Sequence, residues 1–431
     1  MSLNKHEYSE DFMEAIDIGR PPNIKRLFPN SRALLVSGKV IDQAMIAKGK
    51  VMTIAANARN HLIIRGVLQA AQKANAAIII EIAKSEGGSN PYCAINYWNL
   101  ARQVDSICNE LNITIPVAIH ADHYGIKSEK DFETAKIEIP SMFDAGLTSI
   151  AIDASHLSDD KNLLANISLY PFIPKWAGYE TEVGEIKGKE GLTTFEEALF
   201  LVRGLNAHDI FPDWLALNNG TTHGLEKSDK GIQVELTKKI HSGLTKFNIS
   251  GAQHGTSGNS SDRLRNIALN TRTTKANVAT ALQMISWGLK VNEYGNAIQD
   301  DTGEFIKETN CGITDLLWSE MVNYANDNGL KGGNYKKLNL PFENKILGMP
   351  LDIRERSIKR IEDFVYDLLA NVFNSNDTAP VAIEAILKAG SYDLGQKTTR
   401  TENPDDWTEN NIIKKALSIN SDKGPEGNFD D

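Results

Sequence analysis

The sequence has 431 residues, 41% of them hydrophobic and 24% charged, so it can bury a large core in one or more domains. The formal net charge of −10, without a long basic run, weighs against nucleic acid or an anionic membrane as a partner, and no apolar run is long enough to span a membrane. Cys93, Cys108 and Cys311 are too widely spaced for a thiolate zinc site or a disulfide scaffold, so we expect a cytoplasmic protein.

From residue 51 onward, short apolar runs that predict strands alternate with longer stretches whose spaced apolar residues predict helices. The predicted strands cover residues 51–56, 76–83, 115–122, 147–155, 180–186, 214–220, 247–252 and 274–279. The predicted helices between them include residues 60–73, 92–111, 131–146, 195–205 and 232–244. This alternation is typical of a parallel sheet whose strands are connected by helices.

The predicted strands are apolar on both faces, as parallel strands buried on both sides are. About eight alternations favour a closed (β/α)8 barrel, the TIM barrel, over an open doubly wound sheet, and no GxGxxG motif supports a dinucleotide fold. We predict an α/β protein with one barrel domain over residues 1–373, including a Gly-, Asn- and Lys-rich insertion around 295–350 and an amphipathic helix at 356–373. The barrel carries a C-terminal helical extension, in which residues 374–431 are polar and are expected to be partly disordered or to lie on the surface.

Polar side chains collect where the predicted strands end. His120, Asp122 and His123 close one strand in the run HADHYG, and the other strand ends carry Asp153, Glu180, Glu182, His223, His254 and Asn277. Because the carboxyl ends of barrel strands converge on one rim, these groups are expected to lie together. The run HADHYG alone is consistent with a metal site, an acid/base site or a polar turn. Three histidines on different strands, with carboxylates between them, favour a catalytic divalent metal such as Zn²⁺.

Glycine-rich stretches follow two of these histidines: HGLEKSDKG begins at His223 and HGTSGNSS begins at His254. Either stretch alone is consistent with a simple turn. Glycine also lets backbone N–H groups approach an anion, Ser257 can add a hydroxyl, and a helix beginning near Ser260 would favour a phosphate at its N-terminus. A metal beside such a phosphate cradle indicates a phosphorylated carbonyl substrate.

Six motifs, taken in order, resemble those of the class II, metal-dependent fructose-bisphosphate aldolases: PVAIHADHY, ETEVGEIKGKE, GTTHG, HGTSG, NVAT and PLDIR. The resemblance runs from about Val51 to Phe373. It implies a zinc-dependent lyase that reversibly cleaves fructose 1,6-bisphosphate to dihydroxyacetone phosphate and glyceraldehyde 3-phosphate in glycolysis and gluconeogenesis. It also implies that Co²⁺ or Mn²⁺ can replace Zn²⁺, that the partner is a small phosphorylated sugar, and that the chain forms a homodimer or a larger homo-oligomer.

The resemblance also implies roles for individual residues. The metal ligands would be His123, His223 and His254, with Glu182 as a further ligand and Asp153 at a second or vacated metal position. Asp122 would act as acid/base at the C4 oxygen, Glu190 would handle the proton on the enediolate carbon, and Asn277 would hydrogen-bond the enediolate. The substrate and phosphate contacts would be Asn57, Ser85, Gly224, Lys227, Gly255, Ser257, Thr280 and Arg354, the last often from a neighbouring subunit. His120 is expected to support the strand end.

Three positions depart from the family pattern. Tyr124 stands where Gly, Ala or Cys is usual, Lys187 replaces a Gly, and Ala279 replaces an acidic or amide residue that contacts substrate. An aldolase for another ketose, such as tagatose 1,6-bisphosphate, is therefore an alternative. A metal-dependent barrel hydrolase is a second alternative, although such enzymes usually carry HxH on the first strand. A barrel that has lost catalysis is the third, and the presence of all the key residues weighs against it.

Overall fold

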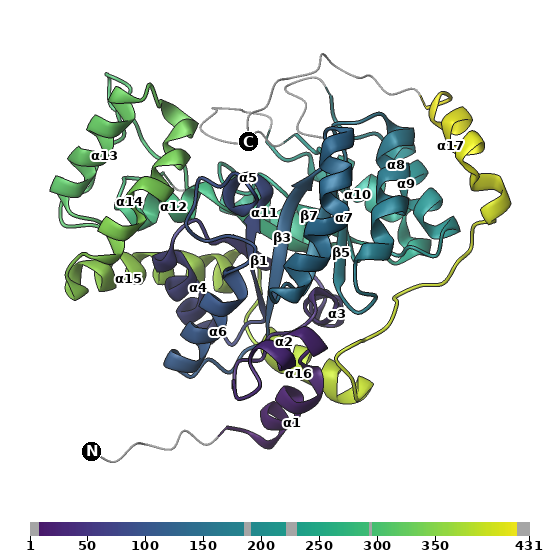
Figure 1. Ribbon diagram of the computed structural model, residues 1–431, viewed down its shortest axis with the longest axis horizontal. Coiled ribbons are helices and arrows are strands. Elements are labelled where there is room, and N and C mark those ends of the chain that lie inside the picture. The colour runs from purple at the N-terminus through teal and green to yellow at the C-terminus, as the bar shows by residue number, and fades with distance from the viewer. Residues whose placement is uncertain (1–7, 185–190, 221–230, 293–294, 420–431) are drawn as a thin grey trace.

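Eight parallel strands close into a barrel in chain order (Figure 1). This computed structural model describes residues 8–184, 191–220, 231–292 and 295–419. The strands are β1 (Thr53–Asn57), β2 (Ile78–Ala83), β3 (Val117–Gly125), β4 (Ser149–Asp153), β5 (Gly178–Val183), β6 (Trp214–Leu217), β7 (Ser250–Gln253) and β8 (Thr273–Val278). Strand β8 pairs in parallel with β1 and so completes the ring. The predicted TIM barrel is confirmed.

Helices connect the strands and form the outer layer of the barrel. They are α4 (His61–Ala74), α5 (Lys84–Gly87), α6 (Leu100–Leu111), α7 (Glu129–Asp144), α8 (Asp159–Leu169), η1 (Tyr170–Phe172), α9 (Phe195–Ala207), α10 (Val234–Gly243), η2 (Thr245–Phe247), α11 (Ser261–Asn270) and α12 (Thr280–Trp287). In four of these helices a capping side chain accepts a hydrogen bond from a free N–H of the first turn; the caps are Asn60, Ser128, Thr194 and Ser260. Such caps stabilise a helix by about 1 kcal/mol each.

Several predicted elements have different ends in the structure, and two of these differences have a local cause. Helix α6 begins at Leu100 rather than at residue 92, because Asn99 Oδ1 accepts the Asn96 N–H at 2.8 Å and Asn96 Oδ1 accepts the Trp98 N–H at 2.9 Å. These side-chain bonds hold the segment in turns that compete with a helix. Strand β5 ends at Val183 because the next residue, Gly184, has a positive φ of 66°.

Helix α3 (Gly38–Lys48) closes the amino-terminal end of the barrel, and α1 (Glu10–Gly19), α2 (Pro22–Leu27) and α16 (Thr378–Ala389) lie at the same end (Figure 1). Glycines allow the close approach of α3 to β5, since a Cβ on Gly178 would lie 2.7 Å from the Gly38 Cα. Ile41 of α3 shares one buried apolar cluster with Ile79 and Trp214 of the barrel. The amino-terminal end of the barrel is therefore closed by packed side chains.

The insertion after α12 is a mostly helical unit on the outside of the barrel. Isolated bridges pair Leu289 with Lys307, Val291 with Ala297 and Gln299 with Phe305. They are followed by α13 (Asp315–Asp327), η3 (Gly332–Leu338) and α14 (Asn339–Leu347). The predicted amphipathic helix is α15 (Leu351–Asp367), which starts after Pro350 and ends in a π-helical turn, η4 (Leu368–Val372). It packs along α4.

The C-terminal extension is held more firmly than its polar composition indicates. After α16, the chain runs up the side of the barrel through η5 (Pro404–Trp407) to α17 (Glu409–Ala416), which lies against α8 (Figure 1). Lys397 forms a buried ion pair with Asp42, and the Trp407 side chain is only 2% exposed beside Phe200. These contacts fasten the extension to α3 at the amino-terminal end of the barrel and to α9 in the outer layer.

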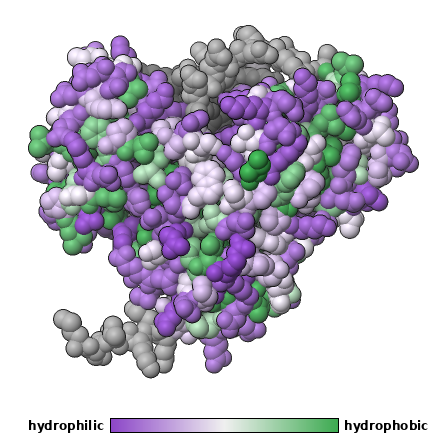
Figure 2. Space-filling model, viewed as in Figure 1, coloured by the Kyte–Doolittle hydropathy of each residue, from purple (hydrophilic) through white to green (hydrophobic). Residues whose placement is uncertain are grey.

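The face of the molecule seen in Figure 2 is mostly hydrophilic, and apolar side chains lie scattered over it. Within the described part of the chain, no helix combines the length and the apolar character needed to cross a bilayer.

Candidate active site

The structure brings most of the predicted catalytic and metal-binding residues together at the carboxyl-terminal rim of the barrel. Each side chain comes from the end of a different element, except for the adjacent pair Asp122 and His123. The gathered residues are Asp122 and His123 of β3, Asp153 of β4, Glu182 of β5, His254 after β7 and Asn277 of β8. The convergence follows from the parallel barrel, because every strand ends at the same rim.

Asp122 and His123 are neighbours in a strand, so a regular pleat would point them to opposite faces. The pleat is interrupted here. His123 has a positive φ of 43°, and the pairing of β3 with β4 shifts register between Ala121 and Tyr124. Both side chains can therefore face the site, at the cost of a left-handed backbone conformation that is unusual for histidine.

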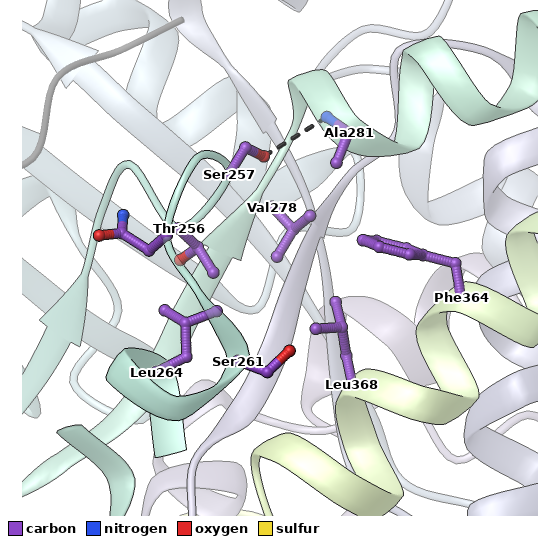
Figure 3. A pocket seen from close by; sticks show the side chains of 9 residues that line it. Thr256, Ser257, Ser261, Leu264, Val278, Ala281, Phe364 and Leu368 are labelled. Carbon is purple, nitrogen blue, oxygen red and sulfur yellow. Dashed lines mark hydrogen bonds between the residues drawn. The ribbon is translucent and has the colours of Figure 1, made fainter. Parts of the chain in front are cut away.

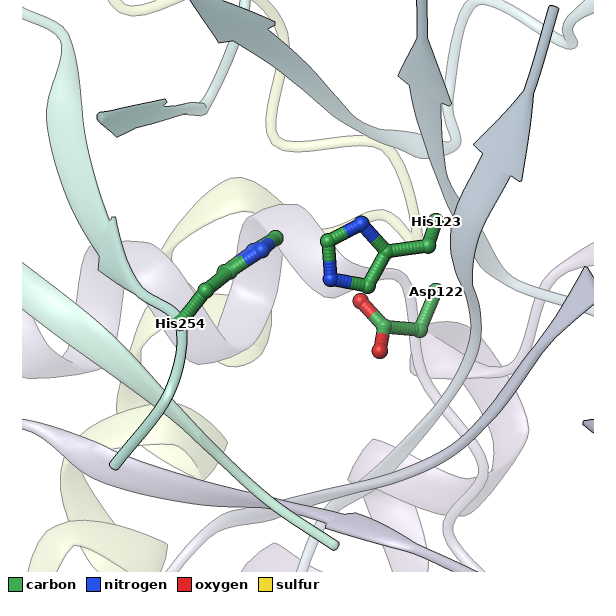
Figure 4. Close-up of side chains that lie close together, drawn as sticks. All are labelled: Asp122, His123 and His254. Atoms are coloured by element: carbon green, nitrogen blue, oxygen red, sulfur yellow. The ribbon is translucent and has the colours of Figure 1, made fainter. Parts of the chain in front are cut away.

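Two imidazoles and two carboxylates surround one small volume. The His123 and His254 rings have centroids 4.3 Å apart and meet edge to face (Figure 4). His123 Nδ1 lies 3.1 Å from Glu182 Oε1 and 3.4 Å from Asp153 Oδ2, and His254 Nδ1 lies 3.6 Å from Glu182 Oε2. Imidazole nitrogens and carboxylate oxygens at this spacing are the donor set that Zn²⁺ and similar divalent ions prefer.

The electrostatics of this cluster also suit a cation. Burial acts against the charge of His123, but Glu182 and Asp122 outweigh it and raise its pKa well above the usual value. Burial and the neighbouring Asp153 raise the pKa of Glu182. Glu182 Oε1 is buried without a hydrogen bond of suitable geometry among the described residues. The crowded carboxylates thus draw a proton onto His123, and a divalent ion held by these donors would take its place.

Asp122 is placed as a proton acceptor beside the cluster. Its Oδ1 accepts a hydrogen bond from Asn277 Nδ2 at 2.7 Å. Burial opposes its charge, but His123 and Lys275 lower its pKa below the usual value, so the carboxylate is ionised. The Asn277 Oδ1 atom is buried and has no partner among the described residues. Asn277 therefore holds the Asp122 carboxylate in an orientation in which it can accept a proton at the rim.

Glu180 and His120, which the sequence grouped with the other strand-end residues, belong instead to a set of buried polar and charged residues one step deeper in the barrel, and the sequence did not indicate this set. Glu180, His120 and Lys275 each precede a rim residue by two positions on the same strand, so their side chains point to the same interior. Glu81 of β2 joins them, and Lys275 Nζ lies 2.7 Å from Glu180 Oε2 and 3.2 Å from Glu81 Oε2. The sequence carries one signal that could have predicted this set, namely a charged residue at an inward-pointing position of an otherwise apolar strand.

The predicted phosphate loop lies between the ends of β7 and β8. Gly255 has a positive φ of 60°, and Ser257 Oγ accepts the Ala281 N–H of α12 at 3.4 Å (Figure 3). Thr280 opens α12 next to this contact. A narrow pocket here is lined by Thr256, Ser257, Asn259, Ser261, Leu264, Val278, Ala281, Phe364 and Leu368. The loop glycine, the hydroxyl and the helix N-terminus therefore share one place.

The remaining predicted contacts are spread more widely. Asn57 ends β1 and donates from Nδ2 to Glu86 Oε2 at 2.7 Å, while its Oδ1 is buried without a partner in the described part of the chain. Ser85 lies in α5, directly after β2, and Arg354 lies in α15 of the outer layer. The other predicted site residues, which lie outside the described residues, are Glu190, His223, Gly224 and Lys227.

Tyr124 and Ala279, which both depart from the family pattern, have different surroundings in the structure. Tyr124 points away from the site, since its hydroxyl donates to Glu138 Oε2 of α7 at 2.6 Å and its ring lies 6.2 Å from that of Tyr97. Its size therefore fills space behind β3. Ala279 precedes α12 and provides no side-chain cap for that helix. Lys187 lies outside the described residues.

Residues 39–327 match the family model described as fructose-bisphosphate aldolase class II. A fructose-bisphosphate aldolase of Mycoplasma pneumoniae is 28% identical over 276 residues, which cover 62% of this chain and 89% of that protein. A fructose-bisphosphate aldolase of Staphylococcus aureus is 34% identical over 135 residues, but the match spans 31% of this chain and only 43% of that protein.

Solved structures agree in fold. The YdjI aldolase from Escherichia coli K12 superposes with a TM-score of 0.53 at 18% identity and covers 80% of this chain and 99% of its own. The fructose-bisphosphate aldolase from Campylobacter jejuni gives 0.51 at 20% identity, with 80% and 97% covered. The family match spans most of the barrel and includes every strand that contributes to the rim cluster. The chain therefore belongs to the class II fructose-bisphosphate aldolases, a family of lyases.

Proposed function

We propose that this protein is a zinc-dependent aldolase that cleaves fructose 1,6-bisphosphate reversibly to dihydroxyacetone phosphate and glyceraldehyde 3-phosphate. The observation that carries the proposal is the rim cluster, in which the paired imidazoles of His123 and His254 adjoin the Asp122–Asn277 pair. The proposed metal ligands are His123, His223, His254 and Glu182, with Asp153 nearby. A divalent metal bound there supplies a Lewis acid for the substrate carbonyl.

We assign each proton transfer of the reaction to a residue of the chain. Asp122, ionised and held by Asn277, removes the proton of the C4 hydroxyl, and the C3–C4 bond breaks to release glyceraldehyde 3-phosphate. Asn277 hydrogen-bonds the enediolate of the other half. Glu190 returns a proton to the enediolate carbon, which gives dihydroxyacetone phosphate.

Binding of the two phosphates is assigned to separate parts of the rim. Gly255, Ser257 and Thr280 lie together and provide backbone N–H groups and a hydroxyl for one phosphate, with Gly224 and Lys227 as further contacts. Arg354 would bind the second phosphate from a neighbouring subunit, so we expect a homodimer or larger assembly. Asn57 and Ser85 contact the sugar. We expect the enzyme to act in the cytoplasm, in glycolysis or gluconeogenesis.

A coupled cleavage assay on fructose 1,6-bisphosphate, with metal analysis of the same sample, tests the proposal. Chelation should abolish cleavage, and Zn²⁺, Co²⁺ or Mn²⁺ should restore it, whereas borohydride with substrate should not inactivate the enzyme. Full activity after thorough removal of metal would contradict the proposal. Tagatose 1,6-bisphosphate is assayed in parallel, because Ala279 offers no polar side chain where the family usually has one. A higher kcat/KM for that epimer would change the assigned substrate.

A further inference from the structure

A charged layer lies inside the barrel directly beneath the proposed metal site. Lys275 is at its centre, and its Nζ lies 2.7 Å from Glu180 Oε2, 3.2 Å from Glu81 Oε2 and 3.1 Å from His120 Nε2. All four residues have 0% exposure. The ammonium is also 3.9 Å from Asp122 Oδ1 at the rim. One buried cation thus faces three carboxylates from three strands.

His120 contributes a lone pair to this layer and no charge. Burial, and then the nearby Lys275, lower its pKa to about 4, so the ring is neutral. Its Nδ1 lies 2.7 Å from Ser149 Oγ, and Nε2 faces the ammonium. Nδ1 therefore donates to the serine and Nε2 accepts from Lys275. Burial opposes the charge of Lys275, but Glu180, Glu81 and Asp122 raise its pKa, so the ammonium persists.

Glu180 connects this layer to the metal site. Its Oε2 binds the Lys275 ammonium, and its Oε1 accepts from His254 Nε2 at 2.8 Å. That bond fixes the ring so that His254 Nδ1 faces Glu182. Yet Glu180, Glu182 and His254 also have the spacing of a metal-binding group. Without the ammonium, Glu180 has the charge and the reach to become a metal ligand itself.

Stability alone does not explain the layer. Burying ionised groups carries a desolvation cost, and apolar residues of similar volume are usually as stable or more stable in such positions. The pattern of contacts points instead to the metal site, because one oxygen of Glu180 binds the proposed ligand His254 while the other binds the Lys275 ammonium.

We propose that Lys275 is a positioning residue: its buried ammonium keeps Glu180 hydrogen-bonded to His254 and out of the metal's coordination, so that coordination positions remain for the oxygens of the substrate. This inference rests on the proposed function. The role of Lys275 is tested on metal binding as well as on turnover, so this inference can fail while the proposed function holds, and the reverse.

The test is Lys275→Met in the full-length protein. The Zn²⁺ dissociation constant is measured on chelator-stripped protein with a competing chelator, and kcat and KM are measured on the Zn²⁺-loaded enzyme. We expect Zn²⁺ to bind about 10-fold more tightly, because Glu180 is released as an extra anionic ligand, and kcat to fall by about 100-fold. A general loss of structure would weaken Zn²⁺ binding and activity together, so opposite changes distinguish positioning from a merely structural role.

Two further variants serve as a second test and as a control. Lys275→Met combined with Glu81→Gln removes the ammonium together with an acidic side chain that faces it and still releases Glu180, so it should show the same tighter Zn²⁺ binding if the single variant folds poorly. Lys397→Met removes a buried lysine at the other end of the barrel and should leave Zn²⁺ affinity and kcat unchanged.

Unchanged or weaker Zn²⁺ binding in folded Lys275→Met protein would overturn the inference, as would a kcat within about threefold of wild type. If the wild-type enzyme does not cleave fructose 1,6-bisphosphate, the proposed function fails, and tighter Zn²⁺ binding in the variant still supports the role of Lys275.

Discussion

Lys397 fastens the C-terminal extension to the floor of the barrel, and its replacement by methionine tests how much that contact stabilises the fold. The Lys397 side chain is 6% exposed and forms an ion pair with Asp42, which is fully buried. Lys397 Nζ also donates to the Asp213 carbonyl at 2.8 Å. Thr274 donates to the other oxygen of Asp42 at 2.7 Å, so Asp42 is held in place and cannot turn to water when the lysine is lost.

The expected loss follows from this geometry. Removing one partner of a buried ion pair costs about 3–5 kcal/mol, because the remaining charge is left uncompensated. With an unfolding entropy of about 2.1 cal/mol/K per residue, a chain of this size has roughly 0.9 kcal/mol/K in total, which converts the loss to a fall in Tm of about 3–6 °C. Activity should not change, since the floor and the rim are at opposite ends of the strands.

The loss of stability caused by Lys397→Met should depend on pH. Burial raises the pKa of Asp213 from 3.8 to about 6, and Lys397 partly opposes this rise. Because the folded-state pKa is above the unfolded value, the stability from Asp213 is fully present below about pH 4 and is lost as the pH rises through 6. Without Lys397 the pKa rises further, so the Lys397→Met variant should lose more stability at pH 7.5 than at pH 5.

Thermal unfolding at the two pH values, followed by circular dichroism, measures this effect. Lys388→Met is the matched control, because Lys388 lies in α16 and is 75% exposed in its pair with Glu384. The control should change Tm by less than about 1 °C. An equal loss for Lys397→Met at pH 5 and pH 7.5, or a loss no larger than that of the control, would refute the reasoning.

Two other substitutions test the rim and the extension. Asp122→Asn should lower kcat by about 100-fold to 10,000-fold while the bound Zn²⁺ per chain stays near the wild-type value; turnover within about tenfold of wild type would remove Asp122 from the acid/base role. Trp407→Ala should destabilise the protein by about 3–5 kcal/mol, because the ring is buried against Phe200 and leaves a cavity; a Tm equal to that of Arg400→Ala, a change at an exposed residue of the same segment, would contradict this.

Much of the fold could be predicted from the sequence because its signals are local. Apolar runs with helical stretches between them mark each strand, and the barrel then follows from their number and direction. The prediction failed where a few side-chain hydrogen bonds decide a boundary. At residues 92–99 the apolar spacing suits a helix, but Asn96 and Asn99 bind nearby backbone groups and delay the start of α6. Such local competition is not visible in hydrophobic periodicity.

The candidate site could be predicted in composition but not in geometry. That Asp122, His254 and Asn277 lie together follows from strand ends converging on one rim. Whether Asp122 and His123 both face that rim depended on a break in the pleat, and the structure contains it as the left-handed conformation of His123. The alternation of side chains along a strand shows that such a break is needed, but the sequence does not reveal whether it occurs.

The layer around Lys275 required a different kind of information. Its members lie at inward positions of their strands, so the sequence could have shown that charged side chains enter the barrel. It could not have paired them, because the stagger of a closed barrel decides which residues of distant strands share a level. Lys275 of β8 meets Glu180 of β5 across the interior and Glu81 of β2 beyond β1, although neither strand is its neighbour. An ammonium placed among three carboxylates can select which of them remains available to a metal, and that selection exists only once the barrel is closed.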